Sequence, residues 1–207
     1  MPRKKKAIDY INDLCSSEIA EKRSLGNKLK AQYNKWTESL AVQDFLFFNE
    51  IIQENKAEIG ATQFFGKFRA YAFEEYVYRL LQEKIRLLEP LQLFWGEKCL
   101  VWQRGEKGYA IEFDVSLGKK TNNFVEPLVV FEAKVELDSV RLKTALASFA
   151  ILKQRNPKTR CVLVYVTKEI DSAFLELAGC WIDGIFQFGP ENDESKGFLR
   201  QVSEFLS

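Results

Sequence analysis

The sequence contains no histidine, and this absence excludes several classes of site at once. Without an imidazole, the chain forms no Ser-His-Asp triad, Cys-His protease site, HNH nuclease site or His-ligated zinc site. Its four cysteines are far apart and include no Cys-x-x-Cys pair: Cys15, Cys99, Cys161 and Cys180. We therefore expect reduced, mostly buried thiols in a cytoplasmic protein, without a zinc cluster or a disulfide framework.

Long apolar runs and a large net charge are lacking too. No segment approaches the roughly 20 apolar residues that a membrane helix needs, so we expect no membrane partner. The 30 Lys and Arg residues nearly balance the 29 Asp and Glu residues, which leaves a net charge of +1. Any surface that binds a polyanion must therefore be local. With 207 residues, of which 46% are hydrophobic, the chain fits one globular domain, or one domain with a helical appendage.

Helical periodicity dominates the first part of the chain. A basic arm at residues 2–6 either contacts phosphate or is a solvated terminus. Apolar residues then recur at helical spacing from Ala7 to about Ile59, and we expect breaks at Gly26 and Gly60. We assign residues 1–61 to a helical N-terminal segment that packs on the core and serves DNA binding or dimerisation.

A second helix is predicted from about Thr62 to Glu89, where Pro90 would end it. Glu74 lies on the flank of its apolar face, three residues before Val77, and would point partly toward whatever the helix packs on. This helix opens the main domain, which we assign to residues 62–207.

Strand patterns follow this helix. One strand is predicted near Cys99–Gln103, and two more, Tyr109–Gly118 and Pro127–Glu136, flank a polar turn in the manner of a hairpin. The remaining pattern alternates helices and strands: a helix at Asp138–Lys153, a buried strand at Arg160–Thr167, a helix at Asp171–Ala178, a strand at Trp181–Phe188 and a helix at Ser195–Leu206. Hairpins followed by βαβ crossovers predict an α/β fold with a mixed central sheet flanked by helices.

Charged residues interrupt the two apolar strands of the predicted hairpin. Glu112 and Asp114 lie in the first strand, and Glu132 and Lys134 lie in the second. Residues two apart in a strand point to the same face, so pairing of the strands would gather two or three carboxylates and one ammonium. The pattern fits a salt-bridged patch on a sheet face, and it also fits a binding site.

A binding site of this composition favours a hard divalent cation. Clustered carboxylates raise one another's pKa, and Mg²⁺ or Mn²⁺ would remove that conflict through oxygen ligands. A lysine beside the metal would position a water molecule or stabilise negative charge in the transition state. Together these groups indicate a site that hydrolyses phosphodiester bonds.

The order of these features resembles the PD-(D/E)XK nuclease superfamily, which has the restriction-endonuclease-like fold. The resemblance covers about residues 62–188. It implies that Asp114 and Glu132 bind the metal, that Ala133 supplies its carbonyl and that Lys134 assists the attacking water. The same resemblance implies that Glu74 completes the site as an acid from the preceding helix.

The sequence departs from the superfamily pattern at one position. Phe113, and not proline, precedes Asp114, which leaves Glu112 as a rival metal ligand one residue pair along the strand. Within the superfamily, the compact length and the helical N-terminal segment look most like a type II restriction endonuclease.

That resemblance implies a Mg²⁺-dependent homodimer that cleaves double-stranded DNA. A structure-selective repair or recombination nuclease, and a non-catalytic DNA-binding module on the same fold, are the alternatives. Basic residues at two places are expected to bind DNA: Arg141 and Lys143 after the motif, and Lys119 and Lys120 in the hairpin, beside Asn122 and Asn123, with Arg69 and Arg79 as further candidates.

Overall fold

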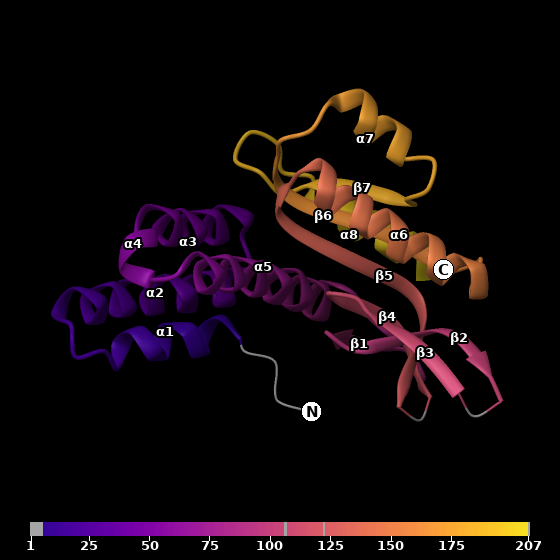
Figure 1. The fold of residues 1–207 in the computed structure, drawn as a ribbon, viewed down its shortest axis with the longest axis horizontal. Coiled ribbons are helices and arrows are strands. Elements are labelled where there is room, and N and C mark those ends of the chain that lie inside the picture. Colours follow the sequence, from indigo (N-terminus) through magenta and orange to yellow (C-terminus); the bar gives the residue numbers. More distant parts are fainter. Residues whose placement is uncertain (1–5, 106, 122, 207) are drawn as a thin grey trace. The chain divides into compact units, whose positions relative to one another are not determined.

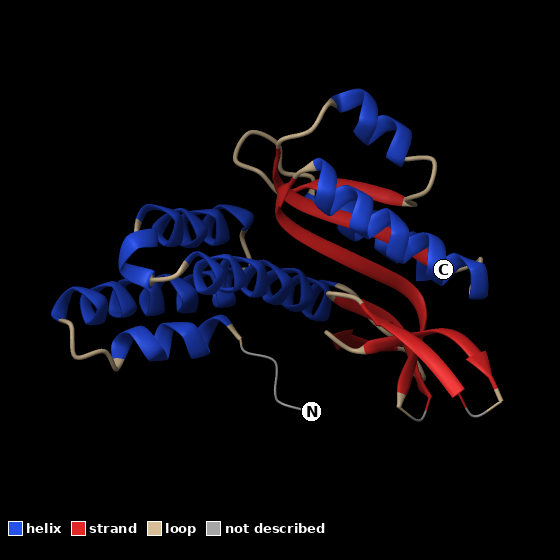
Figure 2. Cartoon of the chain, viewed as in Figure 1, coloured by secondary structure: helices blue, strands red, loops and turns tan. Residues whose placement is uncertain are grey.

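The computed structural model describes residues 6–105, 107–121 and 123–206. It divides into two compact units, Met1–Leu80 and Leu81–Ser207. Helices build the first unit and the second carries a sheet (Figures 1 and 2). The boundary falls inside helix α5 (Thr62–Lys84), whereas the sequence suggested a division at residues 61 and 62. A domain boundary at residues 61 and 62 stays a prediction.

Five helices make up the described part of the first unit: α1 (Ala7–Cys15), α2 (Ala20–Ser39), α3 (Val42–Glu54), α4 (Lys56–Ile59) and most of α5. Their core is aromatic. The Trp36 ring of α2 is fully buried, and its centroid lies 5.8 Å from that of Phe45 and 5.9 Å from that of Tyr76. Phe45 and Tyr76 stack at 4.7 Å, so α2, α3 and α5 share one aromatic cluster.

Of the two helix breaks expected at glycines, one is confirmed and one is wrong. Gly60 follows α4 with a φ of 119°, a conformation that glycine adopts without strain. Gly26 instead lies inside α2, where a Cβ atom would come within 2.7 Å of the Cys15 backbone nitrogen. Glycine at this position lets α1 and α2 pack closely, which is a tertiary requirement that a sequence pattern does not separate from a helix break.

Within the described residues of the second unit, seven strands form one mixed sheet: β1 (Gln92–Trp95), β2 (Lys98–Arg104), β3 (Lys107–Glu112), β4 (Val115–Thr121), β5 (Phe124–Leu137), β6 (Arg160–Lys168) and β7 (Gly184–Gln187). The long strand β5 pairs antiparallel with β4 and parallel with β6. Strand β1 continues the sheet beyond β4, and β7 continues it beyond β6. The β2–β3 hairpin joins the start of β5.

Helices cover both faces of this sheet. Helix α6 (Ser139–Arg155) packs on one face, where Phe149 stacks on Phe113 with ring centroids 6.1 Å apart. Helix α8 (Ser195–Leu206) covers the other face through Phe198, which meets Phe131 edge-on. Helix α7 (Ser172–Ala178) connects β6 to β7. The expected α/β fold, a mixed central sheet flanked by helices, is confirmed.

Three details of the predicted elements are wrong. Helix α5 ends at Lys84 and not near Glu89, and the segment before Cys99 contains the additional strand β1. The predicted strand Tyr109–Gly118 is two strands, because the chain leaves its pairing with β2 at Phe113–Asp114 and then pairs with β5. Five strands, and not three, therefore precede α6. Such a change of partner is set by tertiary pairing and leaves little trace in local hydrophobicity.

Candidate active site

Asp114 lies in the two-residue break between β3 and β4, and not in the middle of a strand. Its backbone carbonyl accepts a hydrogen bond from the Gly96 N–H at 3.0 Å. Gly96 has a φ of 63°, the left-handed conformation that favours glycine, and it turns the chain from β1 into β2. The β1–β2 turn thus holds the backbone of Asp114. Gly96 was not among the residues predicted for the site, although a glycine shortly before the predicted strand Cys99–Gln103 is a signal for a turn.

Glu132, Ala133 and Lys134 lie in the middle of β5, next to the point where β4 begins. The Lys134 ammonium donates to Oδ2 of Asp114 at 2.8 Å and to Oε2 of Glu132 at 2.6 Å. These side chains are 20%, 18% and 11% exposed respectively, so the cluster is largely shielded but open to solvent. The structure therefore brings together the three charged residues that the two-residue spacing singled out.

The backbone of Ala133 faces the same cluster. Its N–H donates to Oδ2 of Asp114 at 2.8 Å. Within a strand, the N–H and C=O of one residue point to the same side, because opposite residues of an antiparallel pair exchange both bonds. The β4–β5 ladder ends at the pair Val115–Phe131, so the Ala133 carbonyl lies beyond that ladder, on the side of Asp114.

The electrostatics of the cluster are unbalanced, with two carboxylates against one ammonium. Burial, and next the charge of Asp114, raise the pKa of Glu132 to about 7. Burial by itself would lower the pKa of Lys134, but the carboxylates of Asp114 and Glu132 outweigh it and raise that pKa above its ordinary value. The lysine is therefore held as a cation, and ionisation of Glu132 is opposed.

The oxygen set of this cluster fits a magnesium ion. Mg²⁺ is commonly held by one or two carboxylates, with water and substrate phosphate completing its shell. Asp114 and Glu132 supply two carboxylates, and the Ala133 carbonyl lies on the same side. Across the described ranges, no group of three or more His, Cys, Asp or Glu side chains is placed to hold a metal. A bound ion would thus depend on these two carboxylates and on non-acidic oxygens.

Glu112, the rival of Asp114, ends β3 opposite Lys98 of β2, and its side chain is exposed. Asp114 lies in the break after β3, and the expectation that Glu112 and Asp114 share a face stays a prediction. Asp114 accepts hydrogen bonds from the Lys134 ammonium and from the Ala133 N–H. The geometry favours Asp114 as the partner of Glu132.

Glu74 is buried on α5, at 5% exposure, in the unit Met1–Leu80. Burial is the largest cause that raises the pKa of Tyr10, followed by the charges of Tyr71, Asp13 and Asp9, and the charge of Glu74 adds the smallest contribution. The Asp114 cluster belongs to the unit Leu81–Ser207, and the role of Glu74 in that site stays a prediction.

The neighbouring Glu75 carries the clearer structural role. It is 1% exposed and accepts hydrogen bonds from the Tyr33 hydroxyl at 2.8 Å and the Ala7 N–H at 3.1 Å. Arg79, a candidate for DNA binding, instead donates to Glu75 from Nε and Nη2 at 3.0 and 2.9 Å. This network ties α1, α2 and α5 together.

Four of the other basic candidates have local contacts, and Lys119 is exposed. Arg141 pairs with Asp138, the residue that caps α6, at 2.6 Å, and Lys120 pairs with Glu97 at 2.7 Å. Lys143 lies 5.9 Å from the centre of the Phe174 ring, and Lys119 is exposed on β4. Arg69 donates to Asn49 at 3.1 Å. Residues 2–5 of the basic arm and Asn122 lie outside the described residues, and the DNA-binding roles stay predictions.

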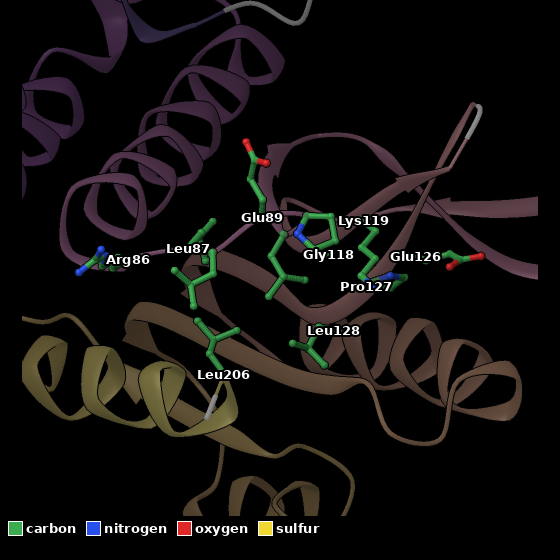
Figure 3. Close-up of a pocket in the computed structure, with 12 residues that line it drawn as sticks. Arg86, Leu87, Glu89, Gly118, Lys119, Glu126, Pro127, Leu128 and Leu206 are labelled. Atoms are coloured by element: carbon green, nitrogen blue, oxygen red, sulfur yellow. The ribbon is translucent and has the colours of Figure 1, made fainter.

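A cavity of about 600 Å³ lies in the second unit, among residues of the α5–β1 loop, β4, β5 and α8. Figure 3 shows Leu87, Leu128 and Leu206 pointing toward one another inside it. Lys119 lines this cavity, but Asp114, Glu132 and Lys134 do not. The cavity is therefore separate from the charged cluster. None of the helices in the described ranges is long and apolar enough to cross a membrane.

N-terminal helices and a mixed central sheet flanked by helices form a restriction-enzyme-like fold. Among solved structures, the chain matches BbvCI, a type II restriction endonuclease whose native form is described as an A2B2 tetramer. The match has a TM-score of 0.56 and 12% identity, and it covers 97% of this chain and 93% of that chain. At this identity, the likeness establishes the fold alone. No family model and no curated protein matches the sequence.

Proposed function

We propose that this chain is a divalent-metal-dependent endodeoxyribonuclease that cleaves double-stranded DNA at specific sequences. The observation that carries this proposal is the contact of Lys134 with both Asp114 and Glu132 on a restriction-endonuclease-like fold. The match extends over nearly the whole chain, including the helical N-terminal part. Fold alone does not define a reaction, so the proposal depends on the chemistry of this cluster.

In this proposal, Asp114, Glu132 and the Ala133 carbonyl hold Mg²⁺, or Mn²⁺ in its place. The metal would supply Lewis acidity, which lowers the pKa of a bound water and stabilises charge on the phosphate. Lys134 orients the attacking water and offsets negative charge through its ammonium. Lys134 pairs with both carboxylates, and a bound divalent cation would share their negative charge and leave the ammonium available to the substrate.

Two further features of the proposal concern the assembly and a third acid. A homodimer would place one site on each strand of a two-fold symmetric DNA sequence. Glu74 would contribute an acid from α5 to the same site. The dimer is tested by sedimentation of the protein on DNA. The acid is tested by the cleavage rate of the Glu74→Gln variant, which should be lower than that of the wild type.

The decisive experiment is digestion of mixed-sequence plasmid DNA in Mg²⁺, in Mn²⁺ and in EDTA. Wild-type protein should give discrete fragments with either metal and none in EDTA. Asp114→Asn and Lys134→Ala should lose cleavage at least a hundredfold, whereas Glu112→Gln should cleave like the wild type. Equal loss in Glu112→Gln and retained activity in Asp114→Asn would reverse the assignment of the metal ligand.

One observation favours a second function, that of a non-catalytic DNA-binding module. Lys134 pairs with both carboxylates, as it would in a salt-bridged patch with a purely structural role. In the described part of the chain, no third acid joins the two carboxylates to form a metal site. Folded protein that binds DNA but cuts nothing in either metal would establish this function. Cleavage confined to branched or damaged DNA would instead indicate a structure-selective repair nuclease.

A further inference from the structure

The β2–β3 hairpin extends from the sheet as a two-stranded ribbon. In the described residues, β2 meets β5 at the single pair Cys99–Val125, and the rest of the hairpin is held by its own ladder. Near the sheet, the ribbon is anchored by Cys99 and Val101, which belong to the core under α6. Toward its turn, the ribbon leaves that core and becomes exposed.

A β-bulge decides which side chains the exposed part presents. The register shifts between Leu100 and Trp102, so that Val101 is an extra residue buried in the core. As a result, Trp102 lies directly opposite Tyr109. Their side chains are 49% and 62% exposed, although aromatic rings of this size are normally removed from water. The ribbon therefore carries a cross-strand pair of exposed aromatic residues.

The next pair toward the turn is cationic. Arg104 lies opposite Lys107, both are exposed, and neither is ion-paired with a described residue. Like charges directly opposite each other destabilise an antiparallel ladder. Because strand residues alternate between faces, this pair lies on the same face as Trp102 and Tyr109. An anionic partner on that face would relieve the repulsion.

The ribbon is continuous in the chain with the proposed active site. Strand β3 leads directly through Phe113 to Asp114, so Lys107 precedes Asp114 by at most about 23 Å of extended chain at roughly 3.3 Å per residue. This span corresponds to about seven base pairs at 3.4 Å each. Val130, Glu132 and Lys134 are successive second residues of β5 and therefore share one of its faces. Val130 belongs to the same core cluster as Cys99 and Val101. The ribbon tip and the site thus use the same face of the sheet.

We propose that the β2–β3 ribbon is a DNA-contacting element, in which Arg104 and Lys107 bind phosphates and Trp102 and Tyr109 lie against the sugars and bases. This inference rests on the proposed nuclease function, because it takes double-stranded DNA as the partner. The major groove admits a two-stranded β-ribbon, in which paired cations can reach the phosphates while aromatic rings contact sugars and the apolar edges of bases. Trp, Tyr and Arg are also enriched in protein interfaces, where lysine is depleted. The cross-strand cation pair Arg104–Lys107 therefore decides for an anionic partner.

The test compares two double variants with the same change in charge. Arg104→Gln/Lys107→Gln neutralises the ribbon, whereas Lys196→Gln/Arg200→Gln removes one Lys and one Arg exposed on α8, across the sheet. Binding to a fluorescent mixed-sequence duplex is measured by anisotropy in EDTA at salt concentrations between about 50 and 200 mM. The logarithm of the binding constant falls linearly with the logarithm of the salt concentration, and each phosphate contact contributes ~0.9 to that slope. The ribbon variant should bind about tenfold more weakly and lose nearly two units of slope, whereas the control should bind within twofold of wild type.

Tryptophan fluorescence reports on the aromatic pair. DNA should quench the wild-type emission, and Trp102→Phe should lose most of that quenching while the exposed Trp181 remains as an internal reference. Tyr109→Ala should weaken binding severalfold without shifting the thermal midpoint by more than a few degrees. Circular dichroism confirms the fold of each variant.

Failure of this inference is distinguishable from failure of the nuclease proposal. If wild-type protein cleaves DNA and the ribbon variant binds and cleaves equally well, the ribbon proposal is overturned and the nuclease proposal stands. If wild-type protein neither binds nor cleaves DNA, both are overturned. Tighter binding to an RNA duplex of the same sequence, or a change in oligomeric state in Trp102→Ala without loss of DNA binding, would also overturn the ribbon proposal.

Discussion

The Nζ atom of Lys134 lies 2.6 Å from Oε2 of Glu132, two residues earlier on the same strand. A pair so close in sequence is a local feature of β5, and it forms because alternate side chains share a face. The pair is unusual because the same ammonium also contacts a second carboxylate, that of Asp114. The pairing of β4 with β5 places Asp114 next to Lys134. The cluster thereby holds more negative than positive charge in a largely buried place.

This imbalance predicts that Glu132→Gln stabilises the protein in metal-free buffer. Because the pKa of Glu132 rises from 4.5 to about 7 on folding, the folded carboxyl keeps its proton between these values while the unfolded one is ionised. Stability therefore falls as pH rises through that window. At about 1.4 kcal/mol per pKa unit, we expect a gain of ~1–3 kcal/mol at pH 8 and little change at pH 4.

Urea unfolding of wild type and Glu132→Gln at both pH values, in EDTA, checks this expectation. Loss of stability at pH 8 would mean that Glu132 acts mainly as an ion-pair partner. The same variant should lose cleavage, so that stability and activity change in opposite directions.

Lys134→Met should have the opposite effect on stability. The folded protein raises the pKa of Lys134, which means that its charge stabilises the fold throughout the neutral range. Removing it leaves the Asp114 and Glu132 carboxylates facing each other, at a cost of about 3 kcal/mol at pH 8. At pH 5 the cost should be smaller, because Glu132 then takes up a proton. A pH-independent loss measured by urea unfolding would contradict this account.

Glu75→Ala should destabilise the helical unit by about 2–4 kcal/mol. The change leaves the Tyr33 hydroxyl and the Ala7 N–H without their acceptor and removes the partner of Arg79. Exposed Glu38→Ala on α2 is the control and should change stability by less than about 0.5 kcal/mol. Thermal unfolding of both variants would decide whether the network matters; equal midpoints would show that it does not.

Asp183→Asn should destabilise the sheet unit by about 1–2 kcal/mol at pH 7. Burial alone would raise the pKa of Asp183, but hydrogen bonds from Lys153, the Cys161 N–H and Arg160 outweigh it and lower that pKa. The stabilisation is therefore present above the ordinary carboxyl pKa of 3.8 and is lost as pH falls below it. In urea unfolding between about pH 7 and pH 2.5, the unfolding free energies of wild type and Asp183→Asn should become equal at acid pH.

Two glycine-to-alanine changes should alter the stability of the fold in opposite directions. At Gly118, beside the bulge between β4 and β5, a Cβ atom would come within 2.1 Å of the Glu126 carbonyl oxygen, so Gly118→Ala should cost several kcal/mol. At Gly66, inside α5, a Cβ atom meets nothing within 4 Å, and Gly66→Ala should add about 0.5–1 kcal/mol. Thermal midpoints measured side by side check both; a stabilising Gly118→Ala would contradict the register of β4 and β5.

The parts of the fold that local signals encode were predictable. Asp138 caps α6 and Asp171 caps α7 through side-chain hydrogen bonds, and the continuous apolar run Arg160–Thr167 is a strand buried between two helical layers. The exchange of strand partners at Phe113–Asp114 was not predictable, because both halves of that segment have the same local β pattern. The helical Gly26 was misjudged for a related reason, since its role depends on Cys15 of another helix.

For the candidate site, the sequence by itself determined that Glu132 and Lys134 share a face, because the side-chain period of a strand is two residues. It also determined that no histidine takes part. Only the tertiary structure decided between Asp114 and Glu112 as the partner on the neighbouring segment, because that choice depends on where β3 ends and on which strand β4 joins. The bulge that sets Trp102 opposite Tyr109 is likewise a product of strand pairing, whose register no local pattern specifies.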